Sequence, residues 1–290
     1  MPIPQFHEIR IENTNACGYK CVMCPREKQT RQIGYMSLDD FNLVLDRVGP
    51  FQGQVHLHGF GEPLLDRSLV LKLKQLKTKS PKSHSLIFST LGVKILDFHA
   101  LATSGLDQLN VSLYGFSRDG YAKVHGYDGF ERVKSNLQHL CQALKETNSP
   151  LKVYLKVPSP NLSSSLPIAL ADEAINFCKW AEGMGLTVGF WPAVHNYGDG
   201  RSFNKPASNV LCPVIAGLRK GILNITWDLF VIPCCFDFNA TIRFGNLRKE
   251  SLEEIFSGPE YLRFVLAHRS GALEQYPVCE NCEKHDYGEW

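Results

Sequence analysis

Three cysteines lie close together near the start of the chain, at a spacing that suits metal chemistry. Cys17, Cys21 and Cys24 form the pattern C-x-x-x-C-x-x-C on the loop after the first predicted strand. A structural zinc ion takes four ligands and would need another one here, such as His7 or His58. A cube of four irons and four sulfides held by three cysteines leaves one iron open. Such an iron can chelate a small molecule and pass it an electron.

A second group of cysteines lies near the C-terminus. Cys279 and Cys282 form a C-x-x-C knuckle, and Cys212 and Cys234 can supply two further thiolates. A structural zinc ribbon and an iron–sulfur cluster both use four cysteines. The spacing by itself therefore leaves both kinds of site open.

The segments that position these cysteines alternate between strand-like and helix-like patterns. The predicted strands are 7–12, 54–58, 85–90, 109–113, 151–157 and 186–191. The predicted helices are 37–48, 67–79, 95–104, 130–145 and 168–184. Six strands with short connections predict a parallel α/β architecture, either a partial barrel or an open sheet. In both, chemistry gathers where strands end and the following loops begin.

The composition changes after the last of these strands. Residues 195–200 are rich in turn formers, and Pro206 follows them. We therefore predict a core domain at 1–205 and a smaller cysteine-rich domain at 206–290. In the latter, Ser251 and Glu254 fit a capping box at the start of a helix.

The bulk composition excludes several classes of protein. The chain has 290 residues, 44% of them apolar, which is enough for a substantial core. The net charge of +2 gives no reason to expect a nucleic-acid partner. The five lysines between Lys72 and Lys82 are interpreted as the solvated face of a helix. Residues 1–6 do not resemble a signal peptide, and no apolar run is long enough to span a membrane, so we expect a cytoplasmic protein. Ten cysteines in such a chain favour metal or redox chemistry over disulfides.

The first cysteine motif resembles the signature of the radical S-adenosylmethionine (radical SAM) superfamily. The segment Gly-Phe-Gly-Glu-Pro at 59–63 follows the second predicted strand and resembles the G-G-E-P motif of that superfamily. One departure is Leu91, where the superfamily often has asparagine. The resemblance implies a partial barrel and a 4Fe–4S cluster held by Cys17, Cys21 and Cys24. It further implies that SAM binds the open iron and is cleaved to a 5′-deoxyadenosyl radical, which abstracts a substrate hydrogen.

The resemblance also implies contacts to SAM at the strand ends. Gly61 lets the backbone approach the ligand, and Glu62 can accept a hydrogen bond from its ammonium group. Ser89 and Ser112 end the third and fourth predicted strands, at places where relatives contact SAM. Lys156 near the end of the fifth strand can pair with the SAM carboxylate. For the last three residues a structural role is an equal alternative.

Residues 212–282 resemble the C-terminal extension called SPASM, or its shortened form, twitch. Shared features are a glycine at 221, Pro-Cys at 233–234, Gly-Asn at 245–246 and a short helix before the final cysteine pair. The cysteines are too few for the two clusters of a full SPASM domain. The resemblance therefore implies one auxiliary 4Fe–4S cluster, an electron relay held by Cys212, Cys234, Cys279 and Cys282.

Further side chains are assigned less directly. Cys235 lies beside a predicted ligand and is either a hydrogen donor to a substrate radical or a small buried residue. Four histidines lie near predicted strand ends: His56, His58, His125 and His195. His58 and His195 can line a substrate cavity, although a structural role is the simpler interpretation for each histidine.

The resemblance implies a radical SAM oxidoreductase that receives electrons from a flavodoxin or ferredoxin. Its substrate is expected to be a small polyol or aminosugar, or else a ribosomally made peptide that is epimerised or cross-linked. Peptide-modifying relatives often carry an extra N-terminal domain. This chain begins six residues before its first predicted strand, which favours the small molecule. The alternative from a different class is a non-catalytic zinc-binding scaffold.

Overall fold

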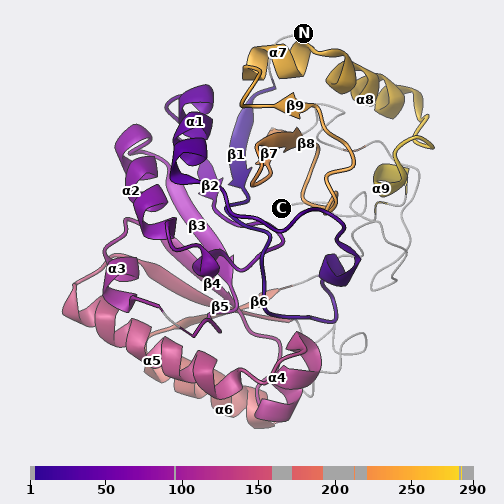
Figure 1. Ribbon diagram of the computed structural model, residues 1–290. Coiled ribbons are helices and arrows are strands. Elements are labelled where there is room, and N and C mark those ends of the chain that lie inside the picture. Colours follow the sequence, from indigo (N-terminus) through magenta and orange to yellow (C-terminus); the bar gives the residue numbers. More distant parts are fainter. Residues whose placement is uncertain are drawn as a thin grey trace.

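A nine-stranded sheet forms the centre of the molecule, with strand order β6-β5-β4-β3-β2-β1-β7-β8-β9 (Figure 1). The computed structural model describes residues 4–94, 96–158, 172–191, 212, 221–280 and 282. Strands β1 to β6 are parallel neighbours in chain order. They span Phe6–Ile11, Gln54–His56, His84–Ser89, Gln108–Ser112, Lys152–Pro158 and Thr187–Trp191. This arrangement confirms the predicted α/β partial barrel.

Helices connect these strands and cover the outer side of the sheet, as Figure 1 shows for α1, α2, α5 and α6. Helices α1 to α6 span Leu38–Val48, Leu69–Lys79, Phe98–Ala102, Arg118–His125, Phe130–Glu146 and Asp172–Gly183. Two short 3-10 helices, η1 and η2, span Pro25–Lys28 and Pro63–Leu65. Helix α4 was not predicted, because it has only eight residues and one of them is Gly120, a poor helix former. Residues 168–171 of the last predicted helix lie outside the described residues.

Helix α3 is shorter than the predicted helix at 95–104. The side chain of Asp97 accepts a hydrogen bond from the Ala100 N–H at 2.8 Å and so fixes the helix start at Phe98. The helix ends before Gly105, whose φ of 85° lies in the left-handed region.

The two faces of the sheet differ in polarity because side chains alternate along each strand. On β1, Ile9 and Ile11 are buried in the apolar core. The alternate residues Glu8 and Arg10 are polar, and Arg10 pairs in register with the polar His56 of β2. The apolar residues of β1 join the core under the helices, so Glu8 and Arg10 face the interior of the partial barrel.

The C-terminal part of the chain extends the same sheet. Strand β7 (Gly221–Ile225) pairs in parallel with β1, and β8 (Phe230–Ile232) and β9 (Gly245–Asn246) follow as antiparallel strands. Helices α7, α8 and α9 span Leu252–Ser257, Pro259–Ser270 and Pro277–Glu280. The predicted capping box of Ser251 and Glu254 is confirmed at the start of α7. The predicted boundary between residues 205 and 206 lies outside the described residues. In the described part of the chain, no helix is long and apolar enough to cross a membrane.

Lys72 contradicts the prediction that the lysines of α2 all face solvent. Its side chain is fully buried, and its Nζ lies 2.6 Å from Asp66 Oδ2. Burial lowers the pKa of Lys72, while the ion pair with Asp66 acts against that shift. The buried charge is tolerated because the Asp66 carboxylate, from the preceding loop, forms an ion pair with it. The spacing of the lysines alone does not reveal this partner.

We predict that Lys72→Met destabilises the fold by about 3–5 kcal/mol, because Asp66 would lose its cation inside the protein. Urea unfolding followed by circular dichroism measures this loss. Lys74→Met, on the exposed side of the same helix, is the matched control and should change little. Equal losses in the two variants would contradict the proposed contribution of the buried pair.

Candidate active site

The first cysteine group lies on the loop between β1 and η1, at the carboxyl end of the sheet. Cys17, Cys21 and Cys24 are all partly buried. The backbone N–H of Tyr19 donates to Cys17 Sγ at 3.4 Å, and burial raises the pKa of the Cys17 thiol to about 11. Burial raises the pKa of Cys21 as well, and the nearby Cys24 and Cys17 add to the shift. The loop therefore gathers three thiols that need a positive centre to hold them as thiolates.

The donor set fits a four-iron cluster. In the part of the chain that the structure describes, no three His, Cys, Asp or Glu side chains are placed to hold a single metal ion. A cluster makes a different demand, because each thiolate binds a different iron of the cube. Three electrostatically coupled thiols on one partly exposed loop meet that demand.

His125 contacts one of the three cysteines. It was expected near a strand end but is the last residue of α4. Its Nδ1 lies 3.4 Å from Cys21 Sγ, and its Nε2 accepts the Tyr114 N–H at 3.1 Å. Burial lowers the pKa of His125 to about 3, so the imidazole is neutral. A sequence signal for α4 does exist: Ser117 caps its start, and Gly126, with φ of 62°, ends it.

Glu62 is almost fully buried, and its carboxylate is held by the protein itself. Oε1 accepts hydrogen bonds from the Leu64 N–H at 3.1 Å and the Ser89 hydroxyl at 2.6 Å. Oε2 accepts the N–H and the hydroxyl of Thr90 at 2.8 and 2.7 Å. Burial raises the pKa of Glu62, and these hydrogen bonds oppose the shift. The structure thus brings Glu62 and Ser89 together in one network.

Gly61 brings its loop against the cysteine loop. A Cβ at this position would lie 2.3 Å from the Thr14 carbonyl oxygen and 2.7 Å from that of Ala16. The next residue, Glu62, donates its N–H to the Ala16 oxygen at 2.8 Å. Only glycine therefore allows the second motif to approach the first so closely.

Ser112 and Lys156 pair in register on β4 and β5, next to each other at the carboxyl end of the sheet. Burial raises the pKa of Tyr114, and the nearby side chain of Ser112 opposes that shift. Lys156 Nζ lies 5.3 Å from the Tyr154 ring centre, and burial lowers its pKa. No ion pair joins Lys156 to a carboxylate in the described residues. A contact with the SAM carboxylate stays a prediction.

Leu91 stands where the superfamily that the chain resembles often has asparagine. Its φ of 55° lies in the left-handed region, which asparagine and glycine adopt more readily than leucine. The Leu91 side chain is fully buried, and its carbonyl oxygen accepts the Asn136 side-chain N–H at 2.8 Å. Apolar packing thus offsets the strain of the backbone.

The structure links the predicted auxiliary ligands through electrostatic interactions: Cys234 with Cys279 and Cys282, and Cys279 with Cys212. Burial raises the pKa of Cys234, and nearby Cys235, Cys279 and Cys282 add to the shift. Burial, together with Cys282 and Cys212, raises the pKa of Cys279 to about 12. Cys235 adjoins this group through Cys234, and its Sγ accepts a hydrogen bond from Arg10 Nη1 at 2.8 Å. Its thiol is therefore part of a polar contact with β1 and is not an apolar core residue.

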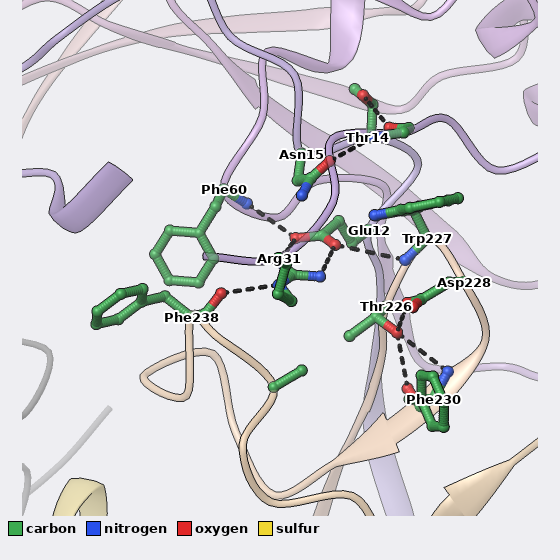
Figure 2. A network of polar contacts seen from close by, with 12 residues as sticks. Glu12, Thr14, Asn15, Arg31, Phe60, Thr226, Trp227, Asp228, Phe230 and Phe238 are labelled. Carbon is green, nitrogen blue, oxygen red and sulfur yellow. Dashed lines mark hydrogen bonds and ion pairs between the residues drawn. The ribbon is translucent and has the colours of Figure 1, made fainter. Parts of the chain in front are cut away.

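Glu12, directly after β1, joins the two cysteine regions (Figure 2). Arg31, in the segment after η1, binds both its carboxylate oxygens at 2.7 and 2.8 Å. Glu12 also accepts the N–H groups of Phe60 and Trp227 at 3.3 and 3.4 Å. Arg31 in turn donates to the carbonyl oxygen of Phe238, four residues after Cys234, at 2.9 Å. One ion pair thus connects the cysteine loop, the glycine-rich motif and the C-terminal extension.

Two sequence profiles match the chain. The profile of the Radical SAM superfamily matches residues 11–153, and SPASM, an iron-sulfur cluster-binding domain, matches residues 218–283. The chain therefore belongs to the radical SAM superfamily and carries a SPASM-type iron–sulfur domain. The matches confirm the predicted class, the radical SAM enzymes.

Similar solved structures cover almost the whole chain. BtrN in complex with AdoMet and 2-DOIA superimposes with a TM-score of 0.64 at 19% identity, over 96% of this chain and 92% of that one. The protein anSMEcpe with AdoMet and the Cp18Cys peptide gives a TM-score of 0.60 at 15% identity, over 95% and 88%. At these identities the likeness shows a shared fold.

Curated relatives match a smaller part of the chain than the solved structures do. The probable GTP 3′,8-cyclase of Saccharolobus solfataricus is 30% identical over 183 residues, which are 62% of this chain and 54% of that protein. The probable GTP 3′,8-cyclase of Sulfurisphaera tokodaii is 28% identical over 179 residues, or 59% and 52%. The chain thus spans about half the length of the curated relatives that it matches.

We predict that Arg31→Met destabilises the protein by about 3–5 kcal/mol, because Glu12 would stay buried without its cation. Thermal and urea unfolding measure the loss. Arg118→Met is the control, since Arg118 forms an exposed pair with Asp128 that contributes little to stability. If the two variants unfold alike, the Glu12–Arg31 pair does not hold the cysteine regions together.

Proposed function

We propose that this enzyme oxidises a small polyol- or aminosugar-like molecule at a C–H bond next to a hydroxyl group. The main support for this proposal is that the cysteines form one group of three and one group of four. Three cysteines leave one iron of a cluster open for SAM, and four leave none. When bound, the first cluster supplies the electron that cleaves SAM, and the second relays an electron from the substrate. A flavodoxin or ferredoxin is the proposed electron donor.

The protein's own residues orient SAM beside the first cysteine group. Glu62 is the proposed acceptor for the ammonium group, which would take the place of the rotatable Thr90 hydroxyl at Oε2. Gly61 holds the loop against the cysteine loop, and Ser89 keeps Glu62 in position. Ser112 and Lys156 are proposed to contact the ribose and the carboxylate from the neighbouring strand ends.

The proposed division of the chain follows from the same grouping. Residues 1–205 would form the radical SAM core, and residues 206–290 a twitch-type domain with the auxiliary cluster on Cys212, Cys234, Cys279 and Cys282. The two matched profiles lie on either side of this boundary.

The proposed class of substrate rests on the similar solved structures and on the polar residues that face the interior of the barrel. BtrN was solved with 2-DOIA and AdoMet, and its fold is similar over 96% of this chain. Removal of a hydrogen atom from a carbon bearing a hydroxyl leaves a radical. Loss of one further electron and the hydroxyl proton then gives a carbonyl. A peptide substrate is the second candidate, because anSMEcpe and the Streptococcus suis protein SuiB were solved with peptides on the same fold.

We predict that the anaerobically purified protein contains about eight irons per chain, as two clusters of four. Cys24→Ala should lose about four of them and form no 5′-deoxyadenosine when reduced with SAM. Cys279→Ala should also lose about four irons but still cleave SAM, because the first cysteine group is intact. Iron analysis measures the cluster content, and chromatography measures the 5′-deoxyadenosine formed.

The control for these variants is Cys178→Ala, a cysteine of α6 outside both groups. It should keep the parent's iron content and SAM cleavage. A colourless parent protein with stoichiometric zinc, or a Cys24→Ala variant that still forms 5′-deoxyadenosine, would refute the assignment of the first cysteine group.

We further predict that a substrate deuterated at the carbon beside a hydroxyl transfers deuterium to 5′-deoxyadenosine. A panel of aminocyclitols and sugars, assayed by mass spectrometry, tests this, with the same compounds deuterated at carbons without a hydroxyl as controls. Transfer from a peptide but from none of the panel would establish the second candidate in place of the first.

A further inference from the structure

The contacts of His125 determine which of its nitrogens carries a proton. The backbone N–H of Tyr114 donates to Nε2 at 3.1 Å, so Nε2 must be the acceptor nitrogen. A neutral imidazole then carries its proton on Nδ1. Nδ1 lies 3.4 Å from Cys21 Sγ. The contact is therefore an N–H···S hydrogen bond that points at the sulfur of a predicted cluster ligand.

Aromatic side chains keep the imidazole in this orientation. Its ring is stacked on Tyr121, with centres 4.1 Å apart, and on Tyr114, with an interplanar angle of 6°. Tyr19 from the cysteine loop meets it edge-on, with ring centres 5.8 Å apart. The side chain is completely buried. A ring held on several sides cannot turn Nδ1 away from Cys21 without disrupting this packing.

The end of α4 also binds the backbone on both sides of Cys21. The Lys20 N–H donates to the His125 carbonyl at 3.1 Å, and the Val22 N–H donates to that of Val124 at 2.9 Å. Gly126 permits the approach, since a Cβ there would lie 2.6 Å from the Lys20 carbonyl oxygen. One helix end thus fixes the backbone and the sulfur of the same cysteine.

We propose that His125 is a positioning residue that raises the reduction potential of the cluster bound by Cys21. The inference rests on the proposed function, in which Cys21 is a cluster ligand. Reduction adds negative charge to the cluster and its thiolates. A hydrogen bond to a thiolate sulfur therefore favours the reduced state and brings the potential closer to that of the electron donor.

A matched pair of variants separates the two hydrogen bonds of His125. His125→Asn places an amide N–H near the position of Nδ1 and can keep the bond to Cys21. His125→Gln places its carboxamide near the position of Nε2, so it can accept the Tyr114 N–H but gives up the bond to Cys21. Redox titration followed by electron paramagnetic resonance measures the midpoint potential, with the auxiliary cluster removed by Cys279→Ala. We expect a lower potential in His125→Gln and the parent's potential in His125→Asn.

Each other result has a definite meaning. Parental potentials in both variants, or equal shifts in both, overturn the inference, because the bond to Cys21 would then not set the potential. Absence of a four-iron cluster from Cys279→Ala with His125 intact refutes the proposed function instead. If either variant does not bind the cluster, pulsed electron paramagnetic resonance of the SAM-free protein labelled with ¹⁵N-histidine decides. Nitrogen coupling to the reduced cluster supports the inference, and its absence overturns it.

Discussion

The arrangement of the site depends on the buried pair of Glu12 and Arg31. Glu12 lies at the junction of β1 and the cysteine loop. A carboxylate buried there can stay charged only if cationic or hydrogen-bonding groups contact it. Arg31 supplies a two-point ion pair and also reaches Phe238 in the C-terminal extension. Position 59 has room only for glycine, because a Cβ there would lie 2.5 Å from the Glu12 carboxylate. One charge thus constrains three segments that are far apart in the sequence.

The continuous sheet explains why the two cysteine groups belong to one molecule rather than to independent modules. Strand β7 pairs with β1 over its full length, and the chain after β8 leads directly into Cys234 and Cys235. The contact of Cys235 with Arg10 then places the C-terminal extension against the inner face of the barrel. Substrate chemistry that uses both clusters needs such closeness, because electron transfer weakens with separation.

The sequence predicts those features that depend on local pattern. Six strands, the main helices and both cysteine groups follow from periodicity and spacing, because each is encoded within a short segment. Lys72 was misinterpreted because its partner Asp66 stabilises it only through the fold. Helix α4 was missed because it is short and contains Gly120, and the role of His125 was missed with it. The Glu12–Arg31 pair joins loops whose approach no local pattern describes.

The polar inner face has a consequence for what the barrel can hold. Glu8 and Cys235 raise the pKa of Arg10 despite its burial, so the guanidinium stays charged. His56 beside it is neutral, because burial and the Arg10 charge lower its pKa to about 3. An apolar molecule against this wall would offer no hydrogen-bond partner to the charged guanidinium or to the neutral imidazole. A molecule with several hydroxyl or amino groups could hydrogen-bond to both, and this agrees with the polar substrate proposed above.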